Sequence, residues 1–313
     1  MDWAGVKMSG GAQYSYIFNC NIYKNGMIGV GGSNLYKCQV KNCVISYNGT
    51  SLVNPSYEAG GAKHGGLNDV IYQSNVITQN KGFAGLWFDE GGTPAEMGSR
   101  RVVIKNNFIH RNQNTGGGGV FYEISSYALI YNNVFLNNNL RSIYISGSSN
   151  CRIFNNTIIS TKNRAAICVV NRNTYRADGN TVQNNLIYNS EDIDLYMTNN
   201  TYARNNTCNH NLIKRTNSPL LLVYNDGGAT TQHIYSVLDW QNNTPFGYNS
   251  MDAWPNFQAG PAEDNWILTP TSPARDSGVN LSAYYIFNDY ANTHVTTAIT
   301  TSAHMNINNY HNN

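Results

Sequence analysis

One nine-residue segment recurs along this chain and limits what the chain can fold into. Each copy has a short apolar stretch, two Asn-like positions, two apolar residues, and a polar pair that commonly ends in Asn. Internal repetition of this kind is typical of a solenoid, in which each repeat forms one coil. The copies are "IFNCNIYKN" (17–25), "VKNCVISYN" (40–48), "YQSNVITQN" (72–80), "IKNNFIHRN" (104–112), "IYNNVFLNN" (130–138), "IFNNTIIST" (153–161), "VQNNLIYNS" (182–190) and "ARNNTCNHN" (203–211).

Alignment of the copies places one mostly Asn position in a column, with steps of 21–32 residues between members. If each coil pairs with the next in parallel register, equivalent side chains stack about 4.8 Å apart. Stacked asparagines form a ladder of amide hydrogen bonds, which explains why 50 of the 313 residues are Asn. The predicted column contains Cys20, Cys43, Asn75, Asn107, Asn133, Asn156, Asn185 and Asn206.

A second apolar strand follows each repeat, for example "GLWFD" (85–89) and "GVFYE" (119–123). These runs are too short for helices, and Gly and Asn bound them. We therefore predict an all-β, single-domain right-handed parallel β-helix of about eight or more coils. The coils should occupy 1–225, a last irregular coil and C-terminal cap 226–291, and a polar tail 292–313. In the cap, Trp240 and Trp254 are expected to cover the open core.

Composition excludes several classes of function. Charged residues are 12% of the chain, the net charge is +2, and no basic run is present, so we expect no nucleic-acid partner. No apolar run is long enough to span a membrane. The six cysteines lack metal-binding spacing, and we expect stacked thiols rather than a disulfide framework.

The N-terminus does not have the charged and apolar regions of a signal peptide. Coil-like sequence begins almost at residue 1, which would leave the first coil uncovered. We therefore expect that the chain is an N-terminally truncated fragment or that another subunit covers this end.

The repeats and the segment "LTPTSPARDSGVNL" (268–281) together resemble the right-handed parallel β-helix proteins of the pectate-lyase-like fold. In that superfamily a P-x-SPA-x-D-x-G segment often follows the last coils. The resemblance covers roughly residues 15–285 and implies the fold. It does not select a reaction, because this fold hosts lyases, hydrolases, epimerases and phage tailspikes.

Long insertions interrupt the coils in one region, which predicts a binding cleft there. The insertions are "GTSLVNPSYEAGG" (49–61), "EGGTPAEMGSRR" (90–101) and the glycine-rich "QNTGGGG" (113–119). Each adjoins the second strand of one of three consecutive coils. Alignment of these strands places Lys63, Asp89 and Glu123 in one column.

Residues of this column should point outward, because alternate residues of a strand share a face. By the same alternation Gly61, Trp87 and Phe121 share a column, and the two aromatic rings would form an outward platform for sugar rings. Two like charges on adjacent strands are unfavourable, which indicates a functional reason for Asp89 and Glu123.

The expected spacing of about 5 Å matches the carboxylate separation of retaining glycosidases. Mutual repulsion would raise the pKa of one carboxyl, as a general acid beside an ionised nucleophile requires. The alternative is structural: both acids could accept hydrogen bonds from the amides of Gly-rich turns. Further candidates for substrate contact near the pair are Glu90, His64, Arg100, Arg101 and Tyr144.

The pattern "GLWFD … YEIS" also resembles the paired acids of β-helix glycoside hydrolases such as the β-xylosidases of that fold. The resemblance implies that Asp89 is the nucleophile and Glu123 the acid/base. The 12-residue insertion between the two strands departs from that pattern and leaves the substrate open.

Three functions remain open on the sequence. The first is a retaining glycoside hydrolase acting on a polysaccharide or oligosaccharide, without a cofactor. The second is a polysaccharide lyase, in which Lys63 and an Arg act on a uronate and Ca²⁺ bridges the acids. The third is a non-catalytic glycan-binding fibre or phage tailspike. We expect a monomer for a secreted hydrolase, a homotrimer for a fibre, and an extracellular or virion location.

Overall fold

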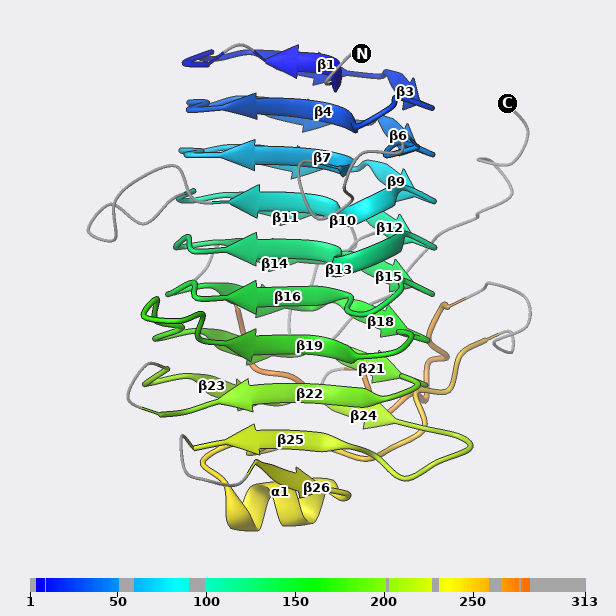
Figure 1. Cartoon of the computed structure of the whole chain (residues 1–313). Helices are drawn as coiled ribbons and strands as arrows, with labels where there is room; N and C mark the ends of the chain where they lie inside the picture. Colours follow the sequence, from blue (N-terminus) through cyan, green and yellow to red (C-terminus); the bar gives the residue numbers. More distant parts are fainter. Residues whose placement is uncertain are drawn as a thin grey trace.

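The structure is a computed structural model that describes residues 4–8, 10–50, 59–89, 99–200, 203–226, 231–258, 266–275 and 277–281. Consecutive strands of the chain lie in three different sheets, and each strand hydrogen-bonds to its equivalents in the coils before and after it. Figure 1 shows the strands stacked as rungs from β1 at one end to β25 at the other. The solenoid expected from the repeat is therefore the observed architecture.

Sheet 1 contains the longest strands and carries the residues singled out above. Nine of its strands are parallel, and the last is antiparallel to its neighbour. Its order is β1 (Ala4–Met8), β4 (Ile28–Ser33), β7 (Gly60–Gly65), β10 (Lys81–Asp89), β13 (Gln113–Glu123), β16 (Ile143–Ser146), β19 (Ala165–Val170), β22 (Ile193–Thr198), β25 (Leu222–Asn225) and β26 (Gln232–Ile234).

Sheets 2 and 3 consist of strands of three residues each, which the repeat segments supply. Sheet 2 is β2 (Tyr16–Phe18), β5 (Gln39–Lys41), β8 (Ile71–Gln73), β11 (Val103–Lys105), β14 (Leu129–Tyr131), β17 (Arg152–Phe154), β20 (Thr181–Gln183) and β23 (Thr207–Asn209). Sheet 3 is β3 (Asn21–Tyr23), β6 (Val44–Ser46), β9 (Val76–Thr78), β12 (Phe108–His110), β15 (Val134–Leu136), β18 (Thr157–Ile159), β21 (Leu186–Tyr188) and β24 (Leu212–Lys214).

The core is a stack of equivalent apolar side chains inside the coils. Sheet 3 contributes the middle residue of each strand, such as Ile77, Ile109 and Ile158, and sheet 2 contributes Ile104 and Ile130 in the same way. Each apolar side chain thus contacts its own equivalents one rung away. This arrangement buries apolar area in a chain that carries few charges.

Each corner between sheets 2 and 3 explains an Asn pair of the repeat. The first Asn adopts a left-handed backbone, with φ of 55° at Asn106 and 54° at Asn132. Asn tolerates this conformation better than most residues other than Gly. The second Asn turns inward and forms the ladder.

The ladder itself is continuous through the middle coils. The Nδ2 of Asn107 donates to Asn133 Oδ1 (3.0 Å) and to Tyr72 O (2.9 Å). The ladder runs from Cys43 through Asn75, Asn107, Asn133, Asn156 and Asn185 to Asn211. All six cysteines are free thiols, and the backbone oxygen of Cys20 accepts from Val44, so Cys20 and Cys43 occupy equivalent positions.

One member of the predicted column was wrong. Asn185 Nδ2 donates to Asn211 Oδ1 (3.1 Å), whereas Asn206 Oδ1 accepts from the backbone of Asn180, in a column with Cys151. The repeat "ARNNTCNHN" contains Asn at 205 and 206 and again at 209 and 211, and the sequence alignment used the first pair. A second ladder, of Asn48, Asn80, Asn112 and Asn138, lines the corner between sheets 3 and 1.

Beyond β25, the chain covers one end of the solenoid (Figure 1). The helix α1 (Val237–Asn243) begins after Ser236, whose hydroxyl accepts from Asp239 N, and it buries Trp240 against the core. Trp254 was expected to cover the core as well, but it is 53% exposed. In the part of the chain that the structure describes, no helix is long and apolar enough to cross a membrane.

We predict that Asn107→Ala destabilises the fold by about 3 kcal/mol, because the change leaves the buried Tyr72 O and Asn75 N without their partner. Urea unfolding followed by circular dichroism measures this. The matched control is Asn217→Ala at an exposed position, which should change the stability by less than about 0.5 kcal/mol. Equal effects of both changes would contradict a structural role of the ladder.

Candidate active site

Asp89 and Glu123 are the last residues of two neighbouring strands. β10 and β13 pair in parallel with Trp87 opposite Phe121 and Phe88 opposite Tyr122, so the next pair is Asp89 and Glu123. Phe88 and Tyr122 point into the core, and the two acids lie on the outer side. The sequence prediction that these acids share a column is therefore confirmed. The next strand places the uncharged Ser146 opposite Glu123.

Glu123 is only 3% exposed, and two side chains hold its carboxyl group. Trp87 Nε1 donates to Oε2 (3.0 Å), and Arg172 Nη1 lies 2.6 Å from Oε1. The backbone oxygen of Glu123 accepts from Ser125 Oγ (2.7 Å). Both the position and the orientation of this carboxyl are thus fixed by its surroundings.

The pKa of Glu123 is raised from its ordinary value of 4.5 to about 7. Burial is the main cause, and the adjacent Asp89 carboxyl contributes through its charge and a hydrogen bond between the two groups. Arg172 and Trp87 act in the opposite direction but do not compensate, and Arg172 is itself 43% exposed. Glu123 therefore holds its proton close to neutral pH.

Asp89 is ion-paired with Lys63, whose Nζ lies 3.2 Å from Asp89 Oδ2. The same ammonium group lies 3.7 Å from the centroid of the Trp87 ring, a cation–π contact. Lys63 therefore joins the site, as the sequence predicted. The two carboxyl groups have different partners: Lys63 for Asp89, and Arg172 with Trp87 for Glu123.

The predicted register of Lys63 was nevertheless wrong by two residues. Lys63 pairs with Trp87, and Gly65 is opposite Asp89. Gly61 correspondingly lies next to Gly85, where a Cβ atom would come within 2.4 Å of Gly85 O. A shift of two residues keeps every side chain on the same face of the strand, so the hydrophobic pattern could not detect it.

The aromatic platform was predicted on the correct face but with the wrong exposure. Trp87 and Phe121 are buried at 5% and 0% exposure, in a cluster separate from the main core. Phe83 packs on both rings, at 4.6 Å from Trp87 and 5.2 Å from Phe121 between centroids. Tyr144 stacks on Phe121 at 4.8 Å. The aromatic rings thus pack against one another beside the two carboxyl groups.

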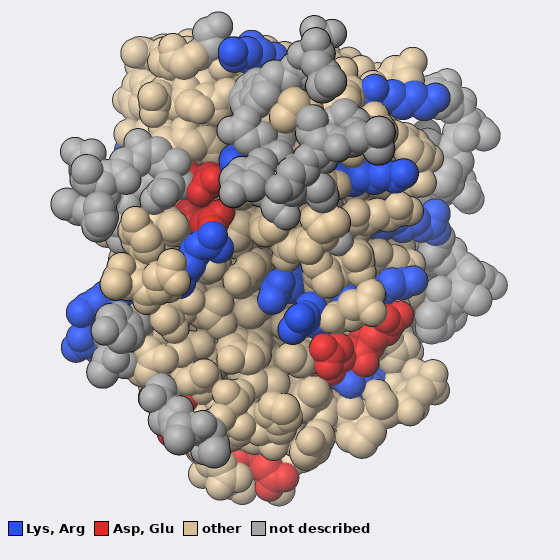
Figure 2. Space-filling model, in the orientation of Figure 1, with Lys and Arg blue, Asp and Glu red and all other residues tan. Residues whose placement is uncertain are grey.

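Arg172 is the residue of this site that the sequence did not indicate. It lies in a short turn after β19, where its backbone pairs with Tyr175, and only β16 lies between β19 and β13, the strand of Glu123. The polar run 171–176 ends a strand at the same sheet edge as both acids, and that position was the available signal. Figure 2 shows the outer face of sheet 1, where a small acidic group is bordered by basic side chains.

His64 does not belong to the site. Its ring points into the core, stacks on Phe88 at 6.2 Å and hydrogen-bonds to Tyr72 Oη. Burial lowers the pKa of His64 to about 4. Neighbouring residues of a strand face opposite sides, so His64 points inward because Lys63 points outward. A register shift of two residues does not change this, and the expectation that His64 contacts substrate does not fit its position.

The remaining candidates for substrate contact are Arg100, Arg101 and Glu90. Arg101 forms an ion pair with Asp69, and Arg100 lies in the corner column between Asn68 and Ser126. Both arginines therefore stack on a corner rather than beside the acids. Glu90 lies outside the described residues, as do most residues of the first two insertions.

The third insertion, expected as a glycine-rich loop, is part of β13. Gly82 pairs with Asn114 and Ala84 with Gly118, so the extra residues of β13 form a bulge. Among the described residues, no three His, Cys, Asp or Glu side chains come together as metal ligands would.

A comparison with protein families agrees with the fold. Residues 70–176, which include Asp89 and Glu123, match the family described as the right handed beta helix region. No curated protein matches the chain. Among solved structures, the chain is similar to trypsin-treated QnrB1, a plasmid-mediated fluoroquinolone resistance protein, at 11% identity and a TM-score of 0.30, over 65% of this chain and 84% of that one. The family match and the stacked sheets confirm the predicted right-handed parallel β-helix.

We predict that Glu123→Gln stabilises the protein at pH 8 by about 1–3 kcal/mol. The folded pKa of about 7 exceeds the ordinary 4.5, so the contribution of Glu123 to stability is present below pH 4.5 and lost as the pH rises through 7. Gln avoids this loss because it stays neutral. Urea unfolding at pH 4 and pH 8 should show the difference only at pH 8.

Asp69→Asn serves as the control for this experiment, since Arg101 lowers the pKa of Asp69. Its effect should have the opposite sign, with lower stability than wild type at neutral pH. A Glu123→Gln variant that is less stable than wild type at pH 8 would show that the ion pair with Arg172 outweighs burial.

Proposed function

We propose that this protein is a glycoside hydrolase that cleaves a polysaccharide or oligosaccharide with retention of configuration. In the first step, Asp89 attacks the anomeric carbon while Glu123 gives its proton to the leaving oxygen. In the second step, the ionised Glu123 takes a proton from water, and the water oxygen displaces Asp89 from the sugar. The aspartate and the protonated glutamate are then restored.

The observation that carries this proposal is the difference between the two neighbouring carboxyl groups. Glu123 is buried and has its pKa raised to about 7, whereas Asp89 is partly exposed and ion-paired with Lys63. A retaining mechanism needs one carboxylic acid and one carboxylate on the same side of the bond to be cleaved. Turn-capping acids have no comparable need for burial next to another acid.

The two carboxyl groups interact directly in the free protein. The Asp89 carboxyl raises the pKa of Glu123 through its charge and a hydrogen bond, and retaining enzymes use two carboxyl groups about 5–5.5 Å apart. Substrate binding has to replace that hydrogen bond with the glycosidic oxygen on Glu123 and the anomeric carbon on Asp89. Parallel pairing keeps the two strands about 4.8 Å apart, so rotation of the side chains is enough to open this space.

The first test compares Asp89→Asn and Glu123→Gln with the wild type on a panel of neutral glycans. Each change should lower kcat/KM about a thousandfold or more, and the double variant should be scarcely worse than either single one. The matched control is Asp69→Asn, a carboxylate of a neighbouring coil that pairs with Arg101 and should leave activity unchanged. The sugar released, followed by proton NMR, should have the same anomeric configuration as the glycosidic bond that was cleaved.

Activity that survives both substitutions would exclude the carboxyl pair as the catalytic group. Wild-type protein that binds glycans without cleaving them would favour the fibre.

A second prediction concerns the pH dependence of the hydrolase. A general acid must be protonated, so activity should fall as the pH rises through about 7. The guanidinium of Arg172 lowers the pKa of Glu123, and Arg172→Gln should therefore move this decline to higher pH. An unchanged pH profile would show that another group is the acid.

Lys63 favours a polysaccharide lyase as the second candidate. Its ammonium group lies beside Asp89, and the guanidinium group of Arg172 lies beside Glu123, so two cations could meet the carboxylate of a uronate. Two acids at the same place would repel such a substrate, which is why the hydrolase is preferred. The appearance of unsaturated products from polyuronates, lost on Lys63→Met and retained with Glu123→Gln, would decide for the lyase.

A further inference from the structure

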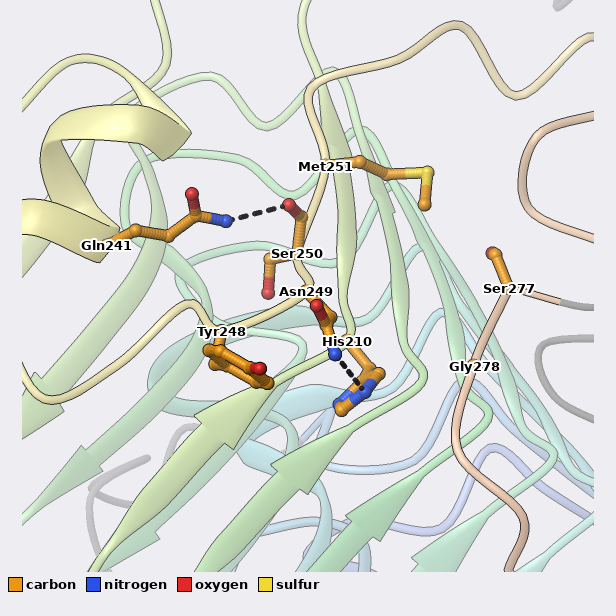
Figure 3. A pocket seen from close by; sticks show the side chains of 8 residues that line it. All are labelled: His210, Gln241, Tyr248, Asn249, Ser250, Met251, Ser277 and Gly278. Atoms are coloured by element: carbon orange, nitrogen blue, oxygen red, sulfur yellow. Dashed lines mark hydrogen bonds between the residues drawn. The ribbon is translucent and has the colours of Figure 1, made fainter.

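A hollow lies at the C-terminal end of the solenoid, away from the carboxyl pair. It has a volume of about 730 Å³, and Figure 3 shows the side chains that line it. Gln241 reaches it from α1, residues 248–251 form one wall, and Ser277 with Gly278 lies opposite. His210, at the corner after β23, lies between these elements. Four rungs separate that corner from the rung of Asp89, about 20 Å along the solenoid.

Apart from Met251, the described lining of the hollow is largely polar, and it carries no Asp, Glu, Lys or Arg. It presents amides from Gln241 and Asn249, hydroxyl groups, and the imidazole of His210. Burial lowers the pKa of His210, so the imidazole is neutral at pH 7. An uncharged lining of hydrogen-bonding groups suits a ligand that is rich in hydroxyl groups and has no net charge.

One aromatic ring is presented to solvent at the hollow. Tyr248 is 71% exposed and meets the His210 ring edge-to-face, with the centroids 6.5 Å apart. An exposed phenol offers an apolar face, on which the C–H groups of a sugar ring can pack, and a hydroxyl group at its end. Tyr248 therefore gives the hollow an exposed apolar face on which a sugar ring can pack.

Two buried polar atoms of the lining have no hydrogen-bond partner among the described residues. Asn249 Nδ2 lies 3.0 Å from His210 Nε2, which makes Nε2 the acceptor and leaves the proton of the neutral ring on Nδ1. That Nδ1 and Ser277 Oγ are the two atoms without a partner. Both atoms are buried beneath the surface of the lining, so the groups that the hollow offers directly to a ligand are those of Tyr248, Asn249 and Gln241.

The corner at His210 also differs from its equivalents in other coils. Asn155 and Asn184 occupy this left-handed position in the two preceding coils, with φ of 51° and 57°, and His210 has φ of 55°. Asn satisfies the corner, so backbone conformation does not demand His here. The larger ring builds a wall of the hollow that an Asn side chain would not reach.

We propose that this hollow binds a sugar unit of a neutral saccharide through Tyr248, His210 and Asn249. The site is separate from the carboxyl pair and does not depend on the catalytic proposal. It would hold a glycan chain on the protein at a distance from Asp89 and Glu123.

The test is binding of xylohexaose, cellohexaose and maltohexaose to the Glu123→Gln variant, measured by saturation-transfer NMR and calorimetry. At least one neutral hexasaccharide should bind, and Tyr248→Ala in the same background should weaken that binding about tenfold or more. Tyr235→Ala is the matched control, since Tyr235 is 59% exposed and lines a different hollow of the cap. It should leave binding unchanged.

Failure of all three hexasaccharides to bind, or equal binding by the Tyr248→Ala variant, would overturn the proposal. Hexagalacturonate is the charged comparison, and binding that is tighter than for every neutral probe and is lost with Tyr248 would also overturn it. None of these outcomes depends on whether Asp89 and Glu123 cleave a glycan, so the two proposals fail separately.

Discussion

Everything in this molecule depends on in-register parallel stacking of equivalent residues, and the Asn ladder enforces that register. Asn107 donates to Asn133 in the next coil and to Tyr72 O in the coil before. A coil that slipped by one residue would lose these buried hydrogen bonds and turn its apolar side chains outward. Because the ladder fixes sheets 2 and 3, the strands of sheet 1 meet their neighbours at fixed places, and the ends of β10 and β13 coincide.

The same constraint gives the candidate site its electrostatics. A repeated coil stacks like on like, so placing acids at equivalent positions of β10 and β13 puts two carboxyl groups side by side at the cost of repulsion. Burial of Glu123 under the Trp87 cluster resolves this by keeping a proton on one of them. Lys63 of β7 pairs with the Asp89 carboxylate, and Arg172, from the turn after β19, contacts Glu123.

The regular repeat made the fold predictable from the sequence, and the insertions limited how precisely the register could be predicted. The repeat predicted parallel stacking of equivalent strands, the Asn ladder and the outward column of Asp89 and Glu123. Insertions before β7 and around β10 broke the alignment, so Lys63 was assigned two residues away from its true partner Trp87. A shift by two preserves the face of each side chain, and only backbone pairing distinguishes the alternatives. The two Asn pairs at 205–211 led the alignment to Asn206 instead of Asn211.

The sequence by itself determined which residues lie inside and which outside, because alternation along strands and the Asn repeat depend on local order alone. It also determined that two acids share a column. The tertiary structure decided what surrounds them: Arg172, which lies two strands away in sheet 1, reaches Glu123, and Phe83 covers the aromatic rings that alternation would leave exposed. Burial is a property of neighbours in space, so the raised pKa of Glu123 and the lowered pKa of His64 became evident only in the assembled coils.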